Sequence, residues 1–133
     1  MLQFAIPYLL TLPILAGLDF LWLRVVAKDL YRSKLEHLLS PDIRWGAAAA
    51  FYIIFAAGLW YFAVAPVAAK PFWGAAAWLG AFYGFFTYAA YDLTNLATLK
   101  QWSVKVTILD MAWGTFLGGV LGAVGYFLFA FFK

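Results

Sequence analysis

Four long apolar segments dominate this sequence and leave little chain for anything else. A helix needs about 20 mostly apolar residues to cross the hydrocarbon core of a membrane. The segments that meet this requirement are residues 2–23, 45–65, 72–95 and 104–132. Only 11% of the residues are charged, against about 25% in an average soluble domain. The sequence therefore predicts one all-α integral membrane domain over residues 1–133, and the short connections favour a compact antiparallel four-helix transmembrane bundle.

A short amphipathic helix is predicted after the first span, at about residues 28–39. Apolar side chains recur there at helical spacing, opposite charged ones: Leu30, Tyr31, Leu35, Leu38 and Leu39. This pattern is typical of a helix that lies in the membrane interface. Ser40 and Pro41 then predict the N-cap and first residue of the second helical span.

Basic residues are distributed unequally between the connections. Seven of them lie in or beside the first and third: Arg24, Lys28, Arg32, Lys34, Arg44, Lys100 and Lys105. The opposite side has Lys70 and Lys133. The positive-inside rule predicts that the first and third connections face the cytoplasm, with both termini outside it. We read the net charge of +3 as membrane flanks and expect no nucleic-acid partner. Without a basic leader or a cleavage site, the first segment is expected to be a retained span.

Three aspartates interrupt the apolar segments at similar expected depths. With a helix rise of about 1.5 Å per residue, Asp19 lies about 7 Å inside the boundary at Arg24, and Asp92 about 12 Å from Lys100. Asp110 lies about 10 Å beyond Ser103. Because the first and third spans run inward and the fourth runs outward, the three carboxyl groups are expected at one level of the cytoplasmic leaflet.

Small residues at every fourth position indicate which helix faces meet. In the third span the small residues are Ala76, Gly80 and Gly84, and Tyr88 and Asp92 continue the same spacing. In the fourth span the small residues are Gly114, Gly118 and Gly122, with Asp110 before them and Tyr126 after them at the same spacing. Residues four apart share a helix face, and small side chains let two helices approach closely. These stripes predict close packing that brings Asp92 and Asp110 together.

A carboxylate in a membrane is costly, roughly 2.5–3.5 kcal/mol on insertion scales, so a reason for it is expected. The aspartates could accept hydrogen bonds that fix the packing, or they could form a functional site. Two neighbouring carboxylates would keep a proton or hold a cation between them, such as Lys100, Lys105, Arg24, a metal ion or a cationic ligand group. The ligand-binding residues that we predict are Asp19, Asp92, Asn95, Asp110, Lys100, Tyr88, Tyr91, Thr94, Thr98, Trp22 and Trp113.

Several other kinds of site find no support in this sequence. The chain has no cysteine, and its single histidine, His37, falls on the predicted interfacial helix. No zinc site, bis-histidine haem, phosphate-binding loop or Ser-His-Asp triad is indicated. We assign no metal ligands and identify no cofactor.

The stretches YDLTNLATLK and VTILDMAWG, with LDFLWL near the start, resemble a bacterial family of short four-span membrane proteins known as a domain of unknown function (DUF2177). The most specific part runs from Tyr91 to Gly114. This resemblance implies an all-helical protein of the bacterial inner membrane and carries no activity with it.

Three functions therefore stand as hypotheses. The first is a module that binds or translocates a small amphipathic molecule, with lipid derivatives among the candidates, through the aspartate site. The second is an intramembrane enzyme that acts on a lipid or isoprenoid by metal or acid–base chemistry. The third is a structural subunit or assembly factor of a membrane complex. The expected partners are membrane lipids and a second copy in a homodimer joined through exposed glycine faces.

Overall fold

The computed structural model describes residues 2–133, and these residues form helices with no strand among them. Helix α1 spans Leu2–Leu21 and continues as a π-helical segment, Trp22–Val26; the short helix α2 spans Lys28–Leu35 and ends in a 3-10 turn, Glu36–Leu38. Helix α3 spans Trp45–Leu59 and extends through further helical turns, Trp60–Val64 and Ala65–Val67. Helices α4 and α5 span Trp73–Thr98 and Val104–Phe132. The prediction of an all-α protein is confirmed.

Among the described residues, three helical segments are long and apolar enough to cross a membrane: Leu2–Val26, Trp45–Val67 and Val104–Phe132. With 26 residues, α4 has the length to do so. Glycine, tryptophan and tyrosine are frequent in α4, and they make it less apolar than the other three.

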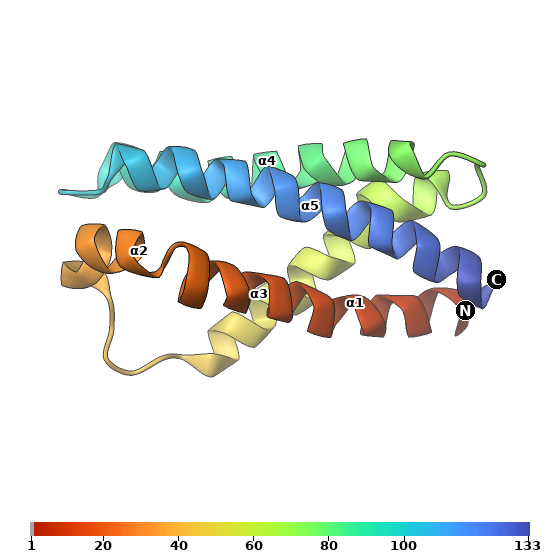
Figure 1. Cartoon of the computed structure of the whole chain (residues 1–133), viewed down its shortest axis with the longest axis horizontal. Helices are drawn as coiled ribbons and strands as arrows, with labels where there is room; N and C mark the ends of the chain where they lie inside the picture. Colours follow the sequence, from red (N-terminus) through yellow and green to blue (C-terminus); the bar gives the residue numbers. More distant parts are fainter. Residues whose placement is uncertain (1) are drawn as a thin grey trace.

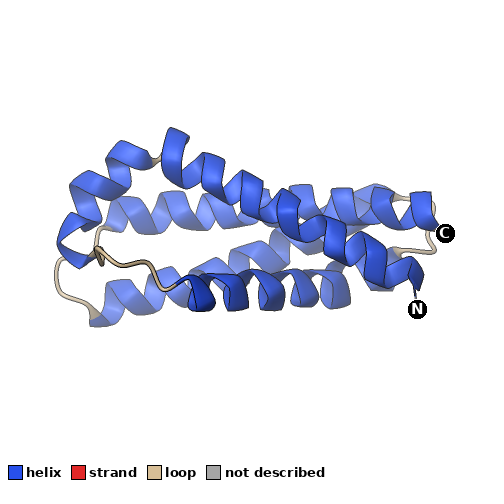
Figure 2. Cartoon of the chain, turned by 90° about the horizontal axis from the view of Figure 1, so that it is seen from below, coloured by secondary structure: helices blue, strands red, loops and turns tan. Residues whose placement is uncertain are grey.

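The long helices lie side by side along the longest axis of the molecule (Figure 1). Both termini and the connection between α3 and α4 lie at one end. The opposite end carries α2 and the connection between α4 and α5, and the quarter turn of Figure 2 shows the same division. We call this second end the basic end, because the segments found there contain Arg24, Lys28, Arg32, Lys34 and Lys100.

The second long helix begins later than the capping signal at Ser40 and Pro41 indicated. Ser40 does not cap it: the Ser40 hydroxyl accepts a hydrogen bond from the backbone N–H of Asp42 at 3.3 Å. Residues 39–44 form a connection, and α3 starts at Trp45. The prediction of a helix start at Ser40 and Pro41 is wrong, because the serine stabilises a local turn in place of a helix N-terminus.

The most extensive helix contact joins α4 and α5, and it is made through glycine. A Cβ atom on Gly84 would collide with the carbonyl oxygen of Gly114, and one on Gly80 would collide with that of Gly118. The predicted meeting of the two small-residue stripes is therefore confirmed. The apolar core beside this contact joins α1, α3 and α5 through buried Leu15, Leu59 and Leu117.

Candidate functional site

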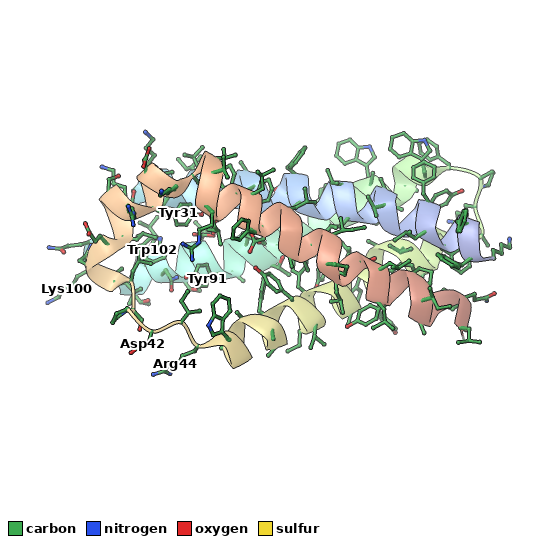
Figure 3. The ribbon with its side chains drawn as sticks, turned by 60° about the horizontal axis from the view of Figure 1, so that its bottom comes forward. Tyr31, Asp42, Arg44, Tyr91, Lys100 and Trp102 are labelled. Carbon is green, nitrogen blue, oxygen red and sulfur yellow. The ribbon has the colours of Figure 1, made fainter. Side chains whose placement is uncertain are left out.

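A cavity of about 410 Å³ opens among α1, α2, α3, α4 and α5 near the basic end. Two of the three buried aspartates line it, and most of its other walls are aromatic. The lining residues are Asp19, Leu23, Tyr31, Phe51, Thr87, Tyr88, Tyr91 and Asp110. Tyr31 and Tyr91 can be followed in Figure 3, which also shows Lys100 pointing away from the bundle at the same end.

Asp19 is held by two donors from other helices. The Tyr52 hydroxyl donates to one carboxylate oxygen at 2.7 Å, and the indole N–H of Trp113 donates to the other at 3.2 Å. The indole of Trp113 is itself stacked on that of Trp22, with ring centroids 4.7 Å apart and planes 2° from parallel. Asp19 is 8% exposed, so these bonds replace most of its contact with solvent and tie α1 to α3 and α5.

Asp110 accepts a hydrogen bond from the short helix α2. The hydroxyl of Tyr31 on α2 donates to its Oδ1 atom, and the indole N–H of Trp22 donates in turn to the Tyr31 hydroxyl at 3.4 Å. Burial raises the pKa of the Tyr31 phenol above its usual value, and the neighbouring Asp110 carboxyl raises it further. The phenol therefore stays protonated as a donor at neutral pH.

Asp92 has a different environment from the other two acids. It is completely buried, and neither of its carboxyl oxygens has a hydrogen-bond partner among the described residues. The side chain that interacts with it is Asp110, which faces it from α5. A buried polar group without a partner costs about 1–3 kcal/mol, so this arrangement requires an explanation.

The small residues of α5 shape the cavity as well as the helix contact. A Cβ on Gly114 would strike the ring of Tyr88, so this glycine provides the space in which Tyr88 lies. The Tyr88 ring also meets Phe55 of α3 edge to face, with centroids 6.2 Å apart. Glycine at 114 thus lets an aromatic side chain of α4 reach the cavity.

The remaining predicted site residues divide into two groups. The first group lies beside the cavity and contacts residues that line it. Trp113 donates to Asp19, Trp22 donates to Tyr31, and the Asn95 side chain lies next to the Tyr91 hydroxyl. The other group is exposed and does not line the cavity: Thr94, Thr98 and Lys100. Their threonine hydroxyls bond to α4 itself, Thr94 to the Tyr91 carbonyl at 3.0 Å and Thr98 to the Thr94 carbonyl at 2.7 Å.

Sequence reasoning missed two tyrosines that complete the site, Tyr31 and Tyr52. Tyr31 was placed on the apolar face of the interfacial helix, and that face is the one that packs against the bundle. The signal that could have identified Tyr31 is its hydroxyl, the one polar side-chain group on that predicted apolar face, which can donate to a carboxylate. Tyr52 belongs to a helix that is apolar on all sides, so no periodic signal singles it out.

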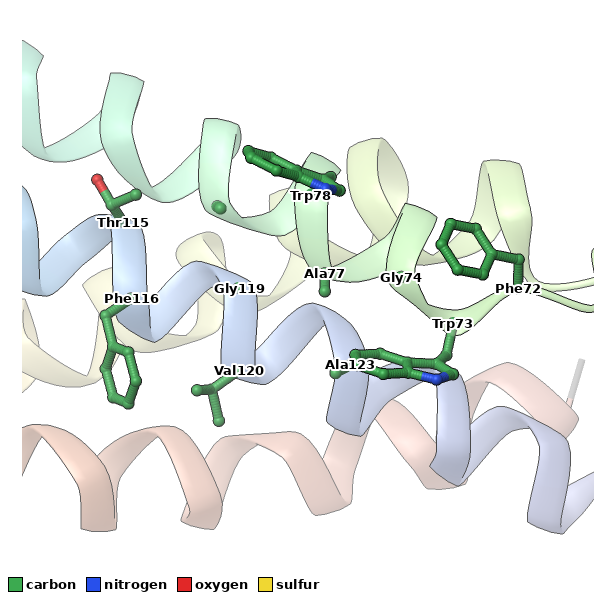
Figure 4. Close-up of a pocket in the computed structure, with 11 residues that line it drawn as sticks. Phe72, Trp73, Gly74, Ala77, Trp78, Thr115, Phe116, Gly119, Val120 and Ala123 are labelled. Atoms are coloured by element: carbon green, nitrogen blue, oxygen red, sulfur yellow. The ribbon is translucent and has the colours of Figure 1, made fainter.

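A second, apolar groove lies on the outer side of α4 and α5 (Figure 4). Its volume is about 660 Å³, its floor includes Ala77 and Gly119, and Trp78 and Phe116 flank it. The Thr115 hydroxyl in its lining donates to the Met111 carbonyl at 2.8 Å within α5. The lining of the groove includes no acidic or basic side chain, which distinguishes it from the aspartate cavity.

Long apolar helices and buried acids together define a helical membrane protein. Residues 4–127 match the family described as "Predicted membrane protein (DUF2177)". The chain belongs to this family, and the resemblance inferred from its motifs is confirmed. No curated protein and no solved structure matches it.

Proposed function

We propose that this membrane protein binds a small amphipathic molecule whose polar group enters the cavity between Asp19 and Asp110. The observation that carries the proposal is that carboxyl groups from helices at opposite ends of the sequence line one cavity. Such a cavity combines an apolar, aromatic body with a few convergent polar groups, which is the usual composition of a small-molecule site.

The membrane arrangement is part of this proposal. We take α4 as a membrane span as well, which gives four spans in all, because it packs along α5 through the glycine contact. The basic end then faces the cytoplasm by the positive-inside rule, and both termini lie on the other side of an inner membrane. In this orientation the ligand enters from the cytoplasmic leaflet, with membrane lipids around the bundle. The homodimer stays a prediction.

One observation favours a second candidate, a purely structural role for Asp19. Its two hydrogen bonds, from Tyr52 and Trp113, join three helices and would stabilise the bundle in the absence of any ligand. Asp110 differs, since the Tyr31 hydroxyl is its one donor among the described residues apart from a shared proton with Asp92. Asp110 is therefore the better position at which to separate binding from folding.

Native mass spectrometry of protein purified in mild detergent tests the proposal. We expect a bound small molecule in the wild type, its loss in Asp110→Asn, and its retention in Asp29→Asn, which changes an exposed acid on α2. Thermal unfolding of each variant is measured in parallel. Retention of the same molecule by Asp110→Asn, or a ligand-free wild type, would contradict the proposal. Destabilisation of Asp19→Asn with normal ligand retention would favour the structural role of that residue.

A further inference from the structure

We propose that the polar group of the ligand is an ammonium ion, and that it binds in exchange for one proton held between Asp92 and Asp110. This inference rests on the proposed function and adds to it the charge of the ligand and a coupled ion. It is carried by two observations: a fully buried carboxyl group without a donor, and a cavity whose walls are carboxylate and aromatic.

The first step concerns Asp92. An ionised carboxylate that is removed from water and receives no hydrogen bond is strongly unfavourable, so a group in this position carries a proton. A protonated carboxyl group is a donor, and the neighbouring acceptor is Asp110. Asp110 then accepts from Asp92 and from Tyr31, and the orphaned atoms of Asp92 gain a partner. One proton is shared by the two carboxyl groups.

The second step concerns charge. The titratable groups that act on this pair come from two other helices and from α4 itself, and none of them is basic: Asp19 of α1, Tyr31 of α2, and Tyr88 and Tyr91 of α4. Tyr52 of α3 reaches the same group through Asp19. With one shared proton, the three aspartates carry a charge of about −2 in a low-dielectric site. If a monovalent cation enters and the proton leaves, the net charge of the three aspartates together with the bound ion stays at about −2. Exchange therefore avoids the cost of changing the buried charge.

The third step concerns the kind of cation. The cavity presents the rings of Tyr31, Phe51, Tyr88 and Tyr91 together with two carboxyl groups. Aromatic faces attract cations, and cages of such rings recognise ammonium groups that carry alkyl substituents. A small inorganic cation would make little use of these rings. An alkylated ammonium uses both the rings and the carboxylates.

The proton has a short route out of the site. Asp110 lies between Asp92 and the Tyr31 hydroxyl, and Tyr31 is part of α2 at the basic end. The proton passes from Asp92 to Asp110 and leaves on that side, while the ammonium group takes its place beside Asp110. No bond other than O–H is broken or formed.

Isothermal titration calorimetry with benzyltrimethylammonium tests the exchange, with benzyl alcohol as the uncharged control. The probe carries a permanent charge, so any proton released comes from the protein. Titrations at one pH in two buffers of different ionisation enthalpy give the number of protons released. We expect about one proton per bound cation, an affinity that rises about tenfold per pH unit while the pair remains protonated, and weaker binding of benzyl alcohol.

Asp92→Asn is the decisive variant, because asparagine has the shape of the protonated acid and can donate to Asp110 but cannot release a proton. We expect it to fold and to bind the probe with proton release near zero. Unchanged proton release in Asp92→Asn would overturn the exchange, as would release near zero in the wild type. Absence of probe binding to the wild type would overturn the choice of an ammonium ligand. The proposed function itself fails only if the mass-spectrometry experiment also gives one of its contradicting outcomes, a ligand-free wild type or the same ligand retained by Asp110→Asn. If Asp92→Asn does not fold, the proton count of the wild type decides.

Discussion

Two neighbouring parts of the same helix pair differ in how they pack. Over Gly80 and Gly84 of α4, the contact with α5 is made by backbone against backbone, and no side chain has room to enter. Two turns beyond Gly84 the helices carry Asp92 and Asp110, and here α1, α2 and α3 supply tyrosine and tryptophan donors. The first region fixes where α4 and α5 lie, and the second uses that fixed position to hold acids side by side.

The largest effect is expected from Gly84→Ala. The new Cβ would meet the backbone carbonyl of Gly114, which cannot rotate away, so α4 and α5 must separate. Overpacking of this kind costs about 1–3 kcal/mol or more, and we expect a value at the upper end. Unfolding in detergent followed by circular dichroism measures it. The matched control is Gly17→Ala, where a Cβ has nothing within 4 Å; equal loss in both variants would remove the special role of the glycine contact.

An intermediate effect is expected from Tyr31→Phe, which removes the donor to Asp110 and leaves the ring in place. A hydrogen bond to a charged group contributes about 1.5–3 kcal/mol. Because the pKa of Tyr31 is raised above its unfolded value of 10.0, its contribution to stability is complete below about pH 10 and is lost as the pH rises further.

The difference in unfolding free energy between wild type and Tyr31→Phe should therefore be constant from about pH 6 to about pH 9 and should narrow above about pH 10. Denaturation curves across this range measure it. Tyr61→Phe serves as the control, since Tyr61 is exposed. A difference that narrowed already near pH 7 would mean that Tyr31 is not a buried neutral donor.

The smallest effect is expected from Thr98→Val. Although the sequence placed Thr98 in the site, its hydroxyl bonds to the Thr94 carbonyl of its own helix and its side chain is exposed. We expect stability within about 0.5 kcal/mol of the wild type and an unchanged calorimetric affinity for benzyltrimethylammonium. A large loss of affinity would extend the site to the end of α4 and blur the boundary between the two regions.

The parts of the molecule that could be predicted depend on local spacing. Glycines at every fourth position indicate which faces of α4 and α5 meet. Because Asp92 and Asp110 lie on the same faces of these helices, their proximity follows from local spacing alone. The wrong helix start at Ser40 is the converse: a serine can cap a helix or stabilise a turn, and the choice depends on how residues 39–44 cross the end of the bundle.

The two tyrosine donors to the acids could not be predicted, because they depend on tertiary placement. Tyr31 reaches Asp110 only because α2 folds back against α5, across 79 residues of sequence. Tyr52 reaches Asp19 from a helix with no distinguishable face. Lys100 was expected as a counter-charge, but the connection after Thr98 turns it outward (Figure 3).

Infrared spectroscopy tests most directly the central claim that Asp92 is enclosed with Asp110 as its partner. The carbonyl stretch of a protonated carboxylic acid is separate from the bands of carboxylates. At neutral pH, the account predicts one such band in the wild type, its loss in Asp92→Asn, its shift in Asp110→Asn, and no change in Asp29→Asn. A wild-type spectrum without this band, or a band that does not respond to Asp110→Asn, would contradict the account.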